Sequence, residues 1–374
     1  MVSAASVVAA LGTVVGTVSA LDDGAANDEA RPGITRSPSL LPLPAVPTPT
    51  RPPSSRPGRS VTSPRAKATA TPTSRPSPSR KATVPVSARL YRHRDAQVDD
   101  WMRAHPGDAR RPVIASRIAS QPVAVWFADY APDAITSRVR DVTSPAAARG
   151  QVPVVVPYAI PGRDCGGASA GGAPDLDAYD AWIDRFAAGL GSGEVIVILE
   201  PDSLAQAGCL PEADRRARYA SLARAGRVVK EADPRARVYY DAGHSGWNPA
   251  ATQAARLRSA GAASAASSDG IFTNVSNFQR TADETAYARQ VLAALDGPPG
   301  LGAVIDTSRN GNGAPADGQW CDPAGRSLGE APTLRTGQAR IDGFLWVKPP
   351  GESDGCKGEP GTFSAAYAYE LATG

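Results

Sequence analysis

Seven short apolar runs recur in the second part of the chain, and longer segments with helical spacing of apolar positions follow most of them. Runs that are apolar at nearly every position are typical of strands buried on both faces of a parallel sheet. A β-then-α unit repeated about seven times at this length predicts an α/β fold, a distorted, TIM-like β/α barrel of about seven parallel strands. The predicted strands are Val123–Ala128, Val152–Pro157, Glu194–Leu199, Arg237–Tyr240, Gly270–Thr273, Ala303–Ile305 and Gly343–Val347, and the predicted helices are 133–149, 175–190, 212–232, 249–260 and 282–295.

The first part of the chain has a different pattern. Residues 2–21 are uncharged and mostly small or apolar, and Val18-Ser19-Ala20 fits the cleavage site of a signal peptide, so residues 1–21 are predicted to be a signal peptide or an N-terminal anchor. Residues 22–87 are rich in Pro, Ser, Thr and Arg, a composition that predicts a disordered linker. Residues 88–374 remain as the folded domain. The protein is therefore expected to be secreted or anchored at the outer cell surface.

Charge is distributed unevenly along the chain. Residues 31–94 hold 13 of the 40 Lys and Arg and no acidic residue, whereas the part from residue 95 has 27 basic and 33 acidic residues and a net charge of −6. A nucleic-acid-binding domain needs a basic face, so this balance argues against a nucleic acid partner for the folded part. The hydrophobic fraction of 42% excludes a fully disordered chain.

The four cysteines and three histidines form no metal-binding pattern. The cysteine spacings contain no C-x-x-C pair, and the histidine spacings contain no H-E-x-x-H motif. No metal site or cofactor is predicted. An even number of cysteines in an exported chain predicts two disulfides.

Candidate chemistry is expected where the strands end, because a β/α barrel builds its active site at the carboxyl ends of its strands. Carboxylates, amides, cations and aromatic rings lie at the ends of all seven predicted strands. In chain order they are Trp126, Asp129, Tyr130, Tyr158, Arg163, Asp164, Glu200, Asp202, Asp241, His244, Trp247, Asn274, Asn277, Asp306, Arg309, Asn310, Lys348, Glu352 and Asp354.

Two alternative chemistries do not fit these residues. The segment 243–247, Gly-His-Ser-Gly-Trp, lacks the second glycine of a nucleophile elbow, and no phosphate-binding glycine loop occurs. Paired carboxylates with aromatic platforms are what glycoside hydrolysis requires: one acid protonates the leaving oxygen, another carboxylate assists water, and flat rings stack on sugars.

The amino-acid sequences of seven segments make the assignment to glycoside hydrolysis specific. VWFADYAP, VPYAIPGRDCGGASAGGAP, VILEPDSLAQAGCL, YYDAGHSGWNP, IFTNVSNFQRT, DTSRNGNG and FLWVKPPGESDG occur in this order. Together they resemble glycoside hydrolase family 6, a family of inverting cellulases, over residues 120–372. The resemblance implies a distorted β/α barrel of about seven strands that hydrolyses β-1,4-glucan.

The resemblance also implies catalytic roles. Asp202 in LEPDSL matches the general acid, and Asp164 in GRDCGG matches the carboxylate that tunes this acid and accepts a proton from water. Asp354 in PPGESDG matches a position interpreted either as the base or as an ion-pair partner, so the base stays open between Asp164 and Asp354. Tyr158 matches a tyrosine that crowds the sugar at the cleavage point.

Further residues match positions that bind the substrate. Ser169 lies in a glycine-rich flap. Because Ala170 occupies the neighbouring position, the role of Ser169 in a proton relay stays open. The predicted substrate-binding residues are Trp126, Ser169, Asp241, His244, Trp247, Asn277, Trp320, Lys348 and Glu352. His244 can alternatively be a structural histidine.

The cysteines match two family disulfides, Cys165–Cys209 and Cys321–Cys356, which would brace the loops of the cleft. Short segments between Ile305 and Trp346 predict an open cleft and an endo-acting β-1,4-glucanase that cleaves cellulose or soluble β-glucan. The alternatives are an exo-acting cellobiohydrolase of the same family and a non-catalytic glucan-binding or envelope-associated protein. No protein partner is implied, and a monomer is expected.

Overall fold

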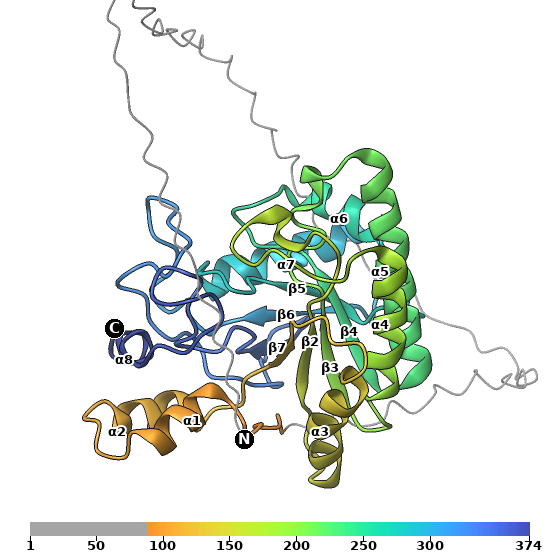
Figure 1. Cartoon of the computed structure of the whole chain (residues 1–374). Helices are drawn as coiled ribbons and strands as arrows, with labels where there is room; N and C mark the ends of the chain where they lie inside the picture. The colour runs from red at the N-terminus through yellow and green to blue at the C-terminus, as the bar shows by residue number, and fades with distance from the viewer. Residues whose placement is uncertain (1–88) are drawn as a thin grey trace, which may run out of the picture. The chain divides into compact units, whose positions relative to one another are not determined.

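A sheet of seven parallel strands lies at the centre of the computed structural model, which describes residues 89–374 (Figure 1). The predicted signal peptide or anchor and the whole of the predicted linker lie outside the described residues. The strands pair in chain order, each in parallel with the next. They are β1 (Val125–Phe127), β2 (Val154–Pro157), β3 (Val195–Leu199), β4 (Ala236–Asp241), β5 (Gly270–Thr273), β6 (Gly302–Asp306) and β7 (Ile341–Leu345).

The sheet curls until β1 and the residue before it contact the residues that follow β7. The backbone N–H of Ala124, next to β1, donates to the carbonyl of Trp346, next to β7, at 2.9 Å. The indole N–H of Trp126 donates to the carbonyl of Val347 at 2.7 Å. We call this junction the β1/β7 seam. The curled parallel sheet confirms the predicted distorted barrel.

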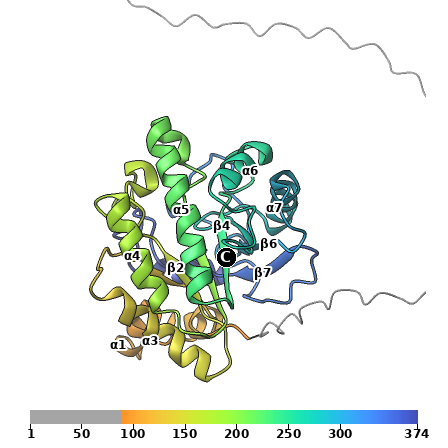
Figure 2. The same cartoon turned by 90° about the vertical axis from the view of Figure 1, so that its right-hand side faces the viewer.

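Five helices cover the outside of the sheet (Figure 2). They follow β1 to β5 in turn and are α3 (Ile135–Ala148), α4 (Leu176–Ala188), α5 (Glu212–Ala232), α6 (Ala250–Ser259) and α7 (Thr281–Leu295). Each agrees with a predicted helix to within two residues at either end.

Strand β3 shows why the strands have continuous apolar sequences. Val195, Val197 and Leu199 pack outward against the helices, and Ile196 and Ile198 pack inside the barrel. Successive side chains of a strand point to opposite faces, so a strand that is buried on both faces needs apolar residues at every position.

One predicted strand is displaced. Strand β7 begins at Ile341, two residues before the predicted start, and so includes the polar residue Asp342. The Tyr239 hydroxyl donates to Oδ2 of Asp342 at 2.9 Å, which gives this carboxylate a partner between strands. The hydrogen bond explains how a polar residue is tolerated within the strand.

The segment that precedes the barrel was not predicted from the sequence. Helices α1 (Gln97–Ala104) and α2 (Arg111–Ile114) and the π-helical turn η1 (Ala115–Ala119) pack against the C-terminal helix α8 (Ala365–Thr373). Apolar side chains from both ends of the domain, among them Val98, Ile118 and Ala368, form a separate small core there. This contact joins the start of the folded domain to its end.

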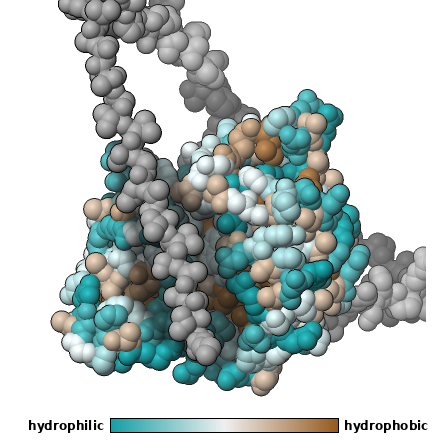
Figure 3. Space-filling model, in the orientation of Figure 1, coloured by the Kyte–Doolittle hydropathy of each residue, from teal (hydrophilic) through white to brown (hydrophobic). Residues whose placement is uncertain are grey.

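One face of the described part is mainly polar. Figure 3 shows hydrophilic residues over most of the face seen in Figure 1, with hydrophobic residues in small groups. Within residues 89–374 there is no helix that is both long and apolar enough to cross a membrane.

Candidate active site

A large cavity opens at the carboxyl ends of the strands. Its volume of about 1120 Å³ is above the about 300–1,000 Å³ that is typical of sites for drug-sized ligands. The cavity brings together twelve of the predicted site residues, which are Trp126, Tyr158, Asp164, Ser169, Asp202, His244, Trp247, Asn277, Trp320, Lys348, Glu352 and Asp354. Residues from most of the strand ends therefore meet in one cleft.

Asp202 lies in a tight turn directly after β3. Glu200 and Asp202 both have left-handed backbones, with φ of +49° and +69°, a conformation that non-glycine residues adopt rarely and that is frequent at functional sites. The Tyr158 hydroxyl donates to Oδ2 of Asp202 at 3.3 Å. Burial, together with the nearby carboxylates of Asp241 and Asp164, raises the pKa of Asp202 to about 8. Asp202 is therefore protonated at neutral pH, as a general acid must be.

Glu200 is fully buried behind this turn. Its Oε2 accepts hydrogen bonds from the backbone N–H groups of Ala159 at 2.9 Å and Ile160 at 3.0 Å. Burial raises the pKa of Glu200 to about 7. Glu200 thus fixes the segment that follows Tyr158 to the end of β3, and so holds Tyr158 against Asp202.

Asp241 does not line the cavity. It is 2% exposed, and its Oδ2 accepts hydrogen bonds from the backbone N–H groups of Leu204 and Ala205 at 3.0 and 2.7 Å. Burial raises the pKa of Asp241. The structure thus places Asp241 behind the acid, where its charge acts on Asp202. The substrate contact predicted for it stays a prediction.

Asp164 lies on the opposite loop, with φ of +53°. The backbone N–H of Ser169 donates to its Oδ2 at 2.8 Å, and the side-chain amide of Gln206 donates to its Oδ1 at 3.1 Å. Arg163 directs its donors to backbone carbonyls, among them that of Ser169 at 2.8 Å. The predicted disulfide Cys165–Cys209 is confirmed and ties this loop to the segment after Asp202.

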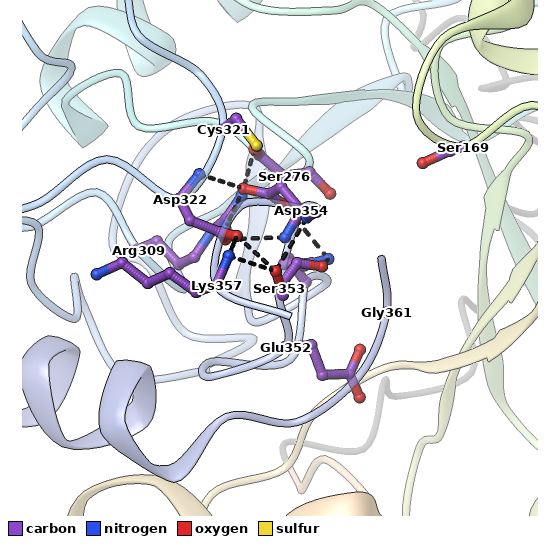
Figure 4. A network of polar contacts seen from close by, with 12 residues as sticks. Ser169, Ser276, Arg309, Cys321, Asp322, Glu352, Ser353, Asp354, Lys357 and Gly361 are labelled. Carbon is purple, nitrogen blue, oxygen red and sulfur yellow. Dashed lines mark hydrogen bonds and ion pairs between the residues drawn. The ribbon is translucent and has the colours of Figure 1, made fainter. Parts of the chain in front are cut away.

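Asp354 lies in a network of charged groups (Figure 4). Its Oδ2 lies 2.7 Å from Nη1 of Arg309, and its Oδ1 lies 3.3 Å from Nζ of Lys348. Asp322 holds the same loop, because its carboxylate accepts hydrogen bonds from the backbone N–H groups of residues 354, 356 and 357. The predicted disulfide Cys321–Cys356 is also confirmed and spans this loop.

Aromatic rings line the cleft at several levels. Trp247 and Trp320 are 40% and 57% exposed, so part of each ring is open to a ligand. Trp126 contacts Tyr158 edge to face, with ring centroids 5.3 Å apart. His244 stacks on Trp247 at 4.8 Å, and burial lowers the pKa of His244 to about 4. His244 is therefore neutral at neutral pH and supports the Trp247 ring.

The N-terminal segment forms one wall of the cleft, which was not predicted from the sequence. His93, Asp95 and Gln97 line the cavity. The Gln97 amide donates to Oε1 of Glu352 at 2.9 Å, and burial raises the pKa of Glu352 to about 7. These residues precede the first strand, so reading the strand ends could not find them.

A catalytic metal has no evident ligands within residues 89–374, where no group of three or more His, Cys, Asp or Glu side chains could hold an ion. The cleft instead combines a protonated carboxyl group, a second carboxylate and exposed tryptophans at the strand ends of a parallel barrel. This combination is typical of enzymes that hydrolyse glycosidic bonds.

Comparison with known proteins narrows this class to one family. The model for "Glycosyl hydrolases family 6" matches residues 85–372, and the chain belongs to this family. The chain is 55% identical to Endoglucanase 1 of Streptomyces sp. (strain KSM-9) over 293 residues, which cover 78% of this chain and 80% of that protein. It is 50% identical to Endoglucanase A of Thermobispora bispora, over 73% of this chain and 59% of that protein.

A solved structure is similar over the same region. The endoglucanase Cel6 from Mycobacterium tuberculosis, in complex with methyl-cellobiosyl-4-deoxy-4-thio-β-D-cellobioside, superimposes with a TM-score of 0.70 at 37% identity. The match covers 76% of this chain and 96% of that structure. The barrel described above is therefore the fold of the family.

Proposed function

We propose that this protein is an endo-β-1,4-glucanase that hydrolyses internal bonds of cellulose or soluble β-glucan with inversion. The observation that carries the proposal is the carboxyl group of Asp202, whose pKa burial raises to about 8, in a cavity that Asp164 also lines. The family match and the endoglucanase relatives support the same activity.

In the proposed reaction, Asp202 protonates the glycosidic oxygen while a water molecule attacks the anomeric carbon from the opposite face of the sugar. The bond between the anomeric carbon and the leaving oxygen breaks as the new bond to water forms. The proton released by water passes to a carboxylate on the other side of the cleft. Tyr158, which contacts both Trp126 and Asp202, crowds the sugar at the point of cleavage.

We assign the proton acceptor to Asp164, reached through a water molecule, rather than to Asp354. The Asp354 side chain is 8% exposed, and its two carboxylate oxygens lie against the cations of Arg309 and Lys348, so both are already engaged in ion pairs. Asp164 is half-buried, lines the cavity and accepts its hydrogen bonds from neutral donors.

The exposed tryptophans of the cleft favour a polysaccharide as the substrate. Exposed rings such as Trp247 and Trp320 offer flat apolar faces that stack on the C–H faces of glucose units. Lys348, Glu352, Asn277 and Ser169 supply polar contacts to hydroxyl groups along the cleft. A binder that does not hydrolyse glucan would not need a carboxyl group held in its protonated form, which favours the enzyme over a binding protein.

The exposure of Trp320 favours endo cleavage. A tunnel that threads a chain end would cover this ring, whereas an open cleft admits the middle of a polymer. An exo-acting enzyme is therefore the second candidate. We further propose that the protein acts as a monomer and is secreted or held at the outer cell surface, in keeping with its two disulfides.

Carboxymethyl cellulose tests the proposal directly. The wild-type protein should lower the viscosity steeply while it produces few new reducing ends, and Asp202→Asn should do neither. Exo action would give reducing ends with little loss of viscosity. If neither carboxymethyl cellulose nor mixed-linkage glucan is cleaved, the assigned activity is wrong. Proton NMR of a fresh digest should show the α-anomer first, and early β-anomer would exclude inversion.

A further inference from the structure

Gln97, in the N-terminal wall of the cleft, makes three hydrogen bonds with its side-chain amide. Its Nε2 donates to Oε1 of Glu352 at 2.9 Å and to the carbonyl of Gly361 at 2.7 Å. Its Oε1 accepts a hydrogen bond from the backbone N–H of Phe363 at 3.0 Å. Both hydrogens and the oxygen of the amide therefore have partners, which fixes the orientation of the side chain.

The backbone that carries Gln97 is held in place by packing. Gln97 is the first residue of α1. One turn later, the ring of Trp101 packs against Phe363, with ring centroids 6.0 Å apart. Val98 lies in the small core that α1 shares with α8. The amide is therefore presented to Glu352 from a fixed support.

Glu352 also lies on a fixed backbone. Residues 351–353 and 362–364 form a short antiparallel pair, in which Glu352 lies opposite Phe363. Two backbone hydrogen bonds of 2.9 and 2.8 Å join these segments. Gln97 contacts both of them, through the side chain of Glu352 and the backbone of Phe363. The amide thus sets the direction of the Glu352 side chain relative to a backbone that is already ordered.

The second carboxylate oxygen of Glu352 is left for a ligand. Within residues 89–374 no hydrogen bond reaches its Oε2, and Glu352 is half-buried and lines the cavity. Lys348 is engaged elsewhere, since its Nζ donates to the carbonyl of Ser353 at 3.2 Å and lies 3.3 Å from Oδ1 of Asp354. Figure 4 shows the Glu352 side chain extending away from the charged network around Asp354. A hydroxyl group of a bound sugar can therefore donate to Oε2.

Without the amide, the Glu352 carboxylate would lose the partner of its Oε1 and its fixed direction. A free glutamate side chain has several rotamers, and ordering it on binding reduces the affinity for a ligand. A side chain that a hydrogen bond has already oriented avoids this loss. The Gln97 amide therefore acts on affinity through the carboxylate and needs no sugar contact of its own.

We propose that Gln97 is a positioning residue for sugar binding: its hydrogen bond to Oε1 orients Glu352 so that Oε2 accepts a hydrogen bond from a hydroxyl group of the glucan. The inference rests on the proposed function, which supplies the glucan and the substrate contact of Glu352. It gives a residue that lies before the barrel a role in the affinity of the cleft.

A double-mutant cycle of Gln97→Met and Glu352→Ala tests the inference. All variants carry Asp202→Asn, so that calorimetry measures the binding of cellohexaose without hydrolysis. Gln97→Met keeps the length of the side chain but loses the amide. With Glu352 present it should weaken binding about 10-fold, the size expected for one lost hydrogen bond that involves a charged group. With Glu352→Ala the same change should weaken binding less than about 2-fold, because the group through which it acts is absent.

Gln338→Met is the matched control. Gln338 is also exposed, and its side-chain oxygen accepts a hydrogen bond from Arg289 outside the cavity. This variant should bind cellohexaose as tightly as its parent. If Gln97→Met fails to fold, Gln97→Glu takes its place in the cycle, because a glutamate keeps the acceptor for Phe363 and loses the donor to Glu352.

Two results overturn the inference. If Gln97→Met leaves the affinity unchanged, the amide does not support sugar binding. If it weakens binding by the same factor with and without Glu352, Gln97 does not act through Glu352. The proposed function fails separately: a protein that shows the expected coupling but cleaves no glucan overturns the proposed activity alone, and a protein that binds no cellohexaose overturns both.

Discussion

Arg309 and Asp354 form a buried ion pair at the edge of the cleft, with Nη1 of Arg309 2.7 Å from Oδ2 of Asp354 and the arginine side chain fully shielded from solvent. Removing one partner of a buried pair destabilises a protein by about 3–5 kcal/mol when the other charge is left without compensation. Without Asp354, Arg309 would keep only Asp322, whose Oδ1 lies 3.9 Å from Nη1. Asp354 therefore contributes to the fold as well as to the cleft.

Asp354→Asn should lower the free energy of unfolding by up to about this amount and lower activity with it. Asp164→Asn should lower kcat strongly with little change in stability, because no cation is left unpaired. Urea unfolding together with kcat for both variants checks the distinction. If Asp354→Asn were as stable as the wild type but inactive, Asp354 would be the better candidate for the base.

The raised pKa of Asp202 predicts an upper limit to the working pH. Activity requires the protonated form, so kcat/KM should fall as the pH passes about 8, the pKa of the folded state. The pH profile on soluble glucan measures this limb directly. If the alkaline limb of the kcat/KM profile lies at the same pH in Asp202→Glu as in the wild type, the titrating group is not Asp202.

The same shift predicts that the acid lowers stability at high pH. Below pH 3.8, its ordinary pKa, Asp202 is protonated in both the folded and the unfolded state. As the pH rises from there to about 8, the unfolded chain releases the proton but the folded protein keeps it, and stability falls. Asp202→Asn should therefore have a higher Tm than the wild type at pH 8 and nearly the same Tm at pH 3.5. Parallel Tm curves would contradict burial of the acid.

The exposed tryptophans should contribute to binding rather than to folding. Trp247→Ala and Trp320→Ala should each weaken the binding of cello-oligosaccharides about 2- to 10-fold, as expected for the loss of one stacking contact. Tm should change little for Trp320→Ala, since that ring is 57% exposed. Tyr369→Ala, also exposed but outside the cleft, is the control. Equal affinities in all three variants would argue against sugar platforms.

The second disulfide should be needed for the shape of the cleft. Cys321 and Cys356 are 35 residues apart, and a loop of that length predicts a stabilisation of about 4 kcal/mol. The double variant Cys321→Ser with Cys356→Ser should lose activity at temperatures well below its Tm, because the loop of Asp354 loosens before the barrel unfolds. Activity and circular dichroism recorded over the same temperature range check this. If activity and the circular dichroism signal are lost at the same temperature, the disulfide stabilises the fold as a whole and not the cleft in particular.

The barrel could be predicted from the sequence because its elements follow local rules. Helix α5 has the predicted bounds, and β5 agrees residue by residue. The carboxyl ends of the strands of a parallel barrel lie at the same end of the barrel. The sequence alone could therefore place Trp126, Asp202 and Lys348 in one cleft.

What the sequence could not predict depends on contacts between distant segments. Gln97 and Glu352 are 255 residues apart, and no periodic pattern links them. The burial of Asp241 and the pairing of Asp354 with Arg309 are likewise set by neighbours from other strands. Residue type shows that a carboxylate is present, but its environment decides whether it donates a proton, accepts one or stabilises a loop.

The β1/β7 seam has a consequence for the motion of the cleft. Strand β1 has only three residues, and the seam depends on the Ala124 and Trp126 hydrogen bonds, so local opening of the barrel should begin there. Trp126 also lines the cavity. A sugar stacked on its ring would hold the indole against Val347 and suppress opening, so amide hydrogen exchange along the seam would slow when the polymer is bound.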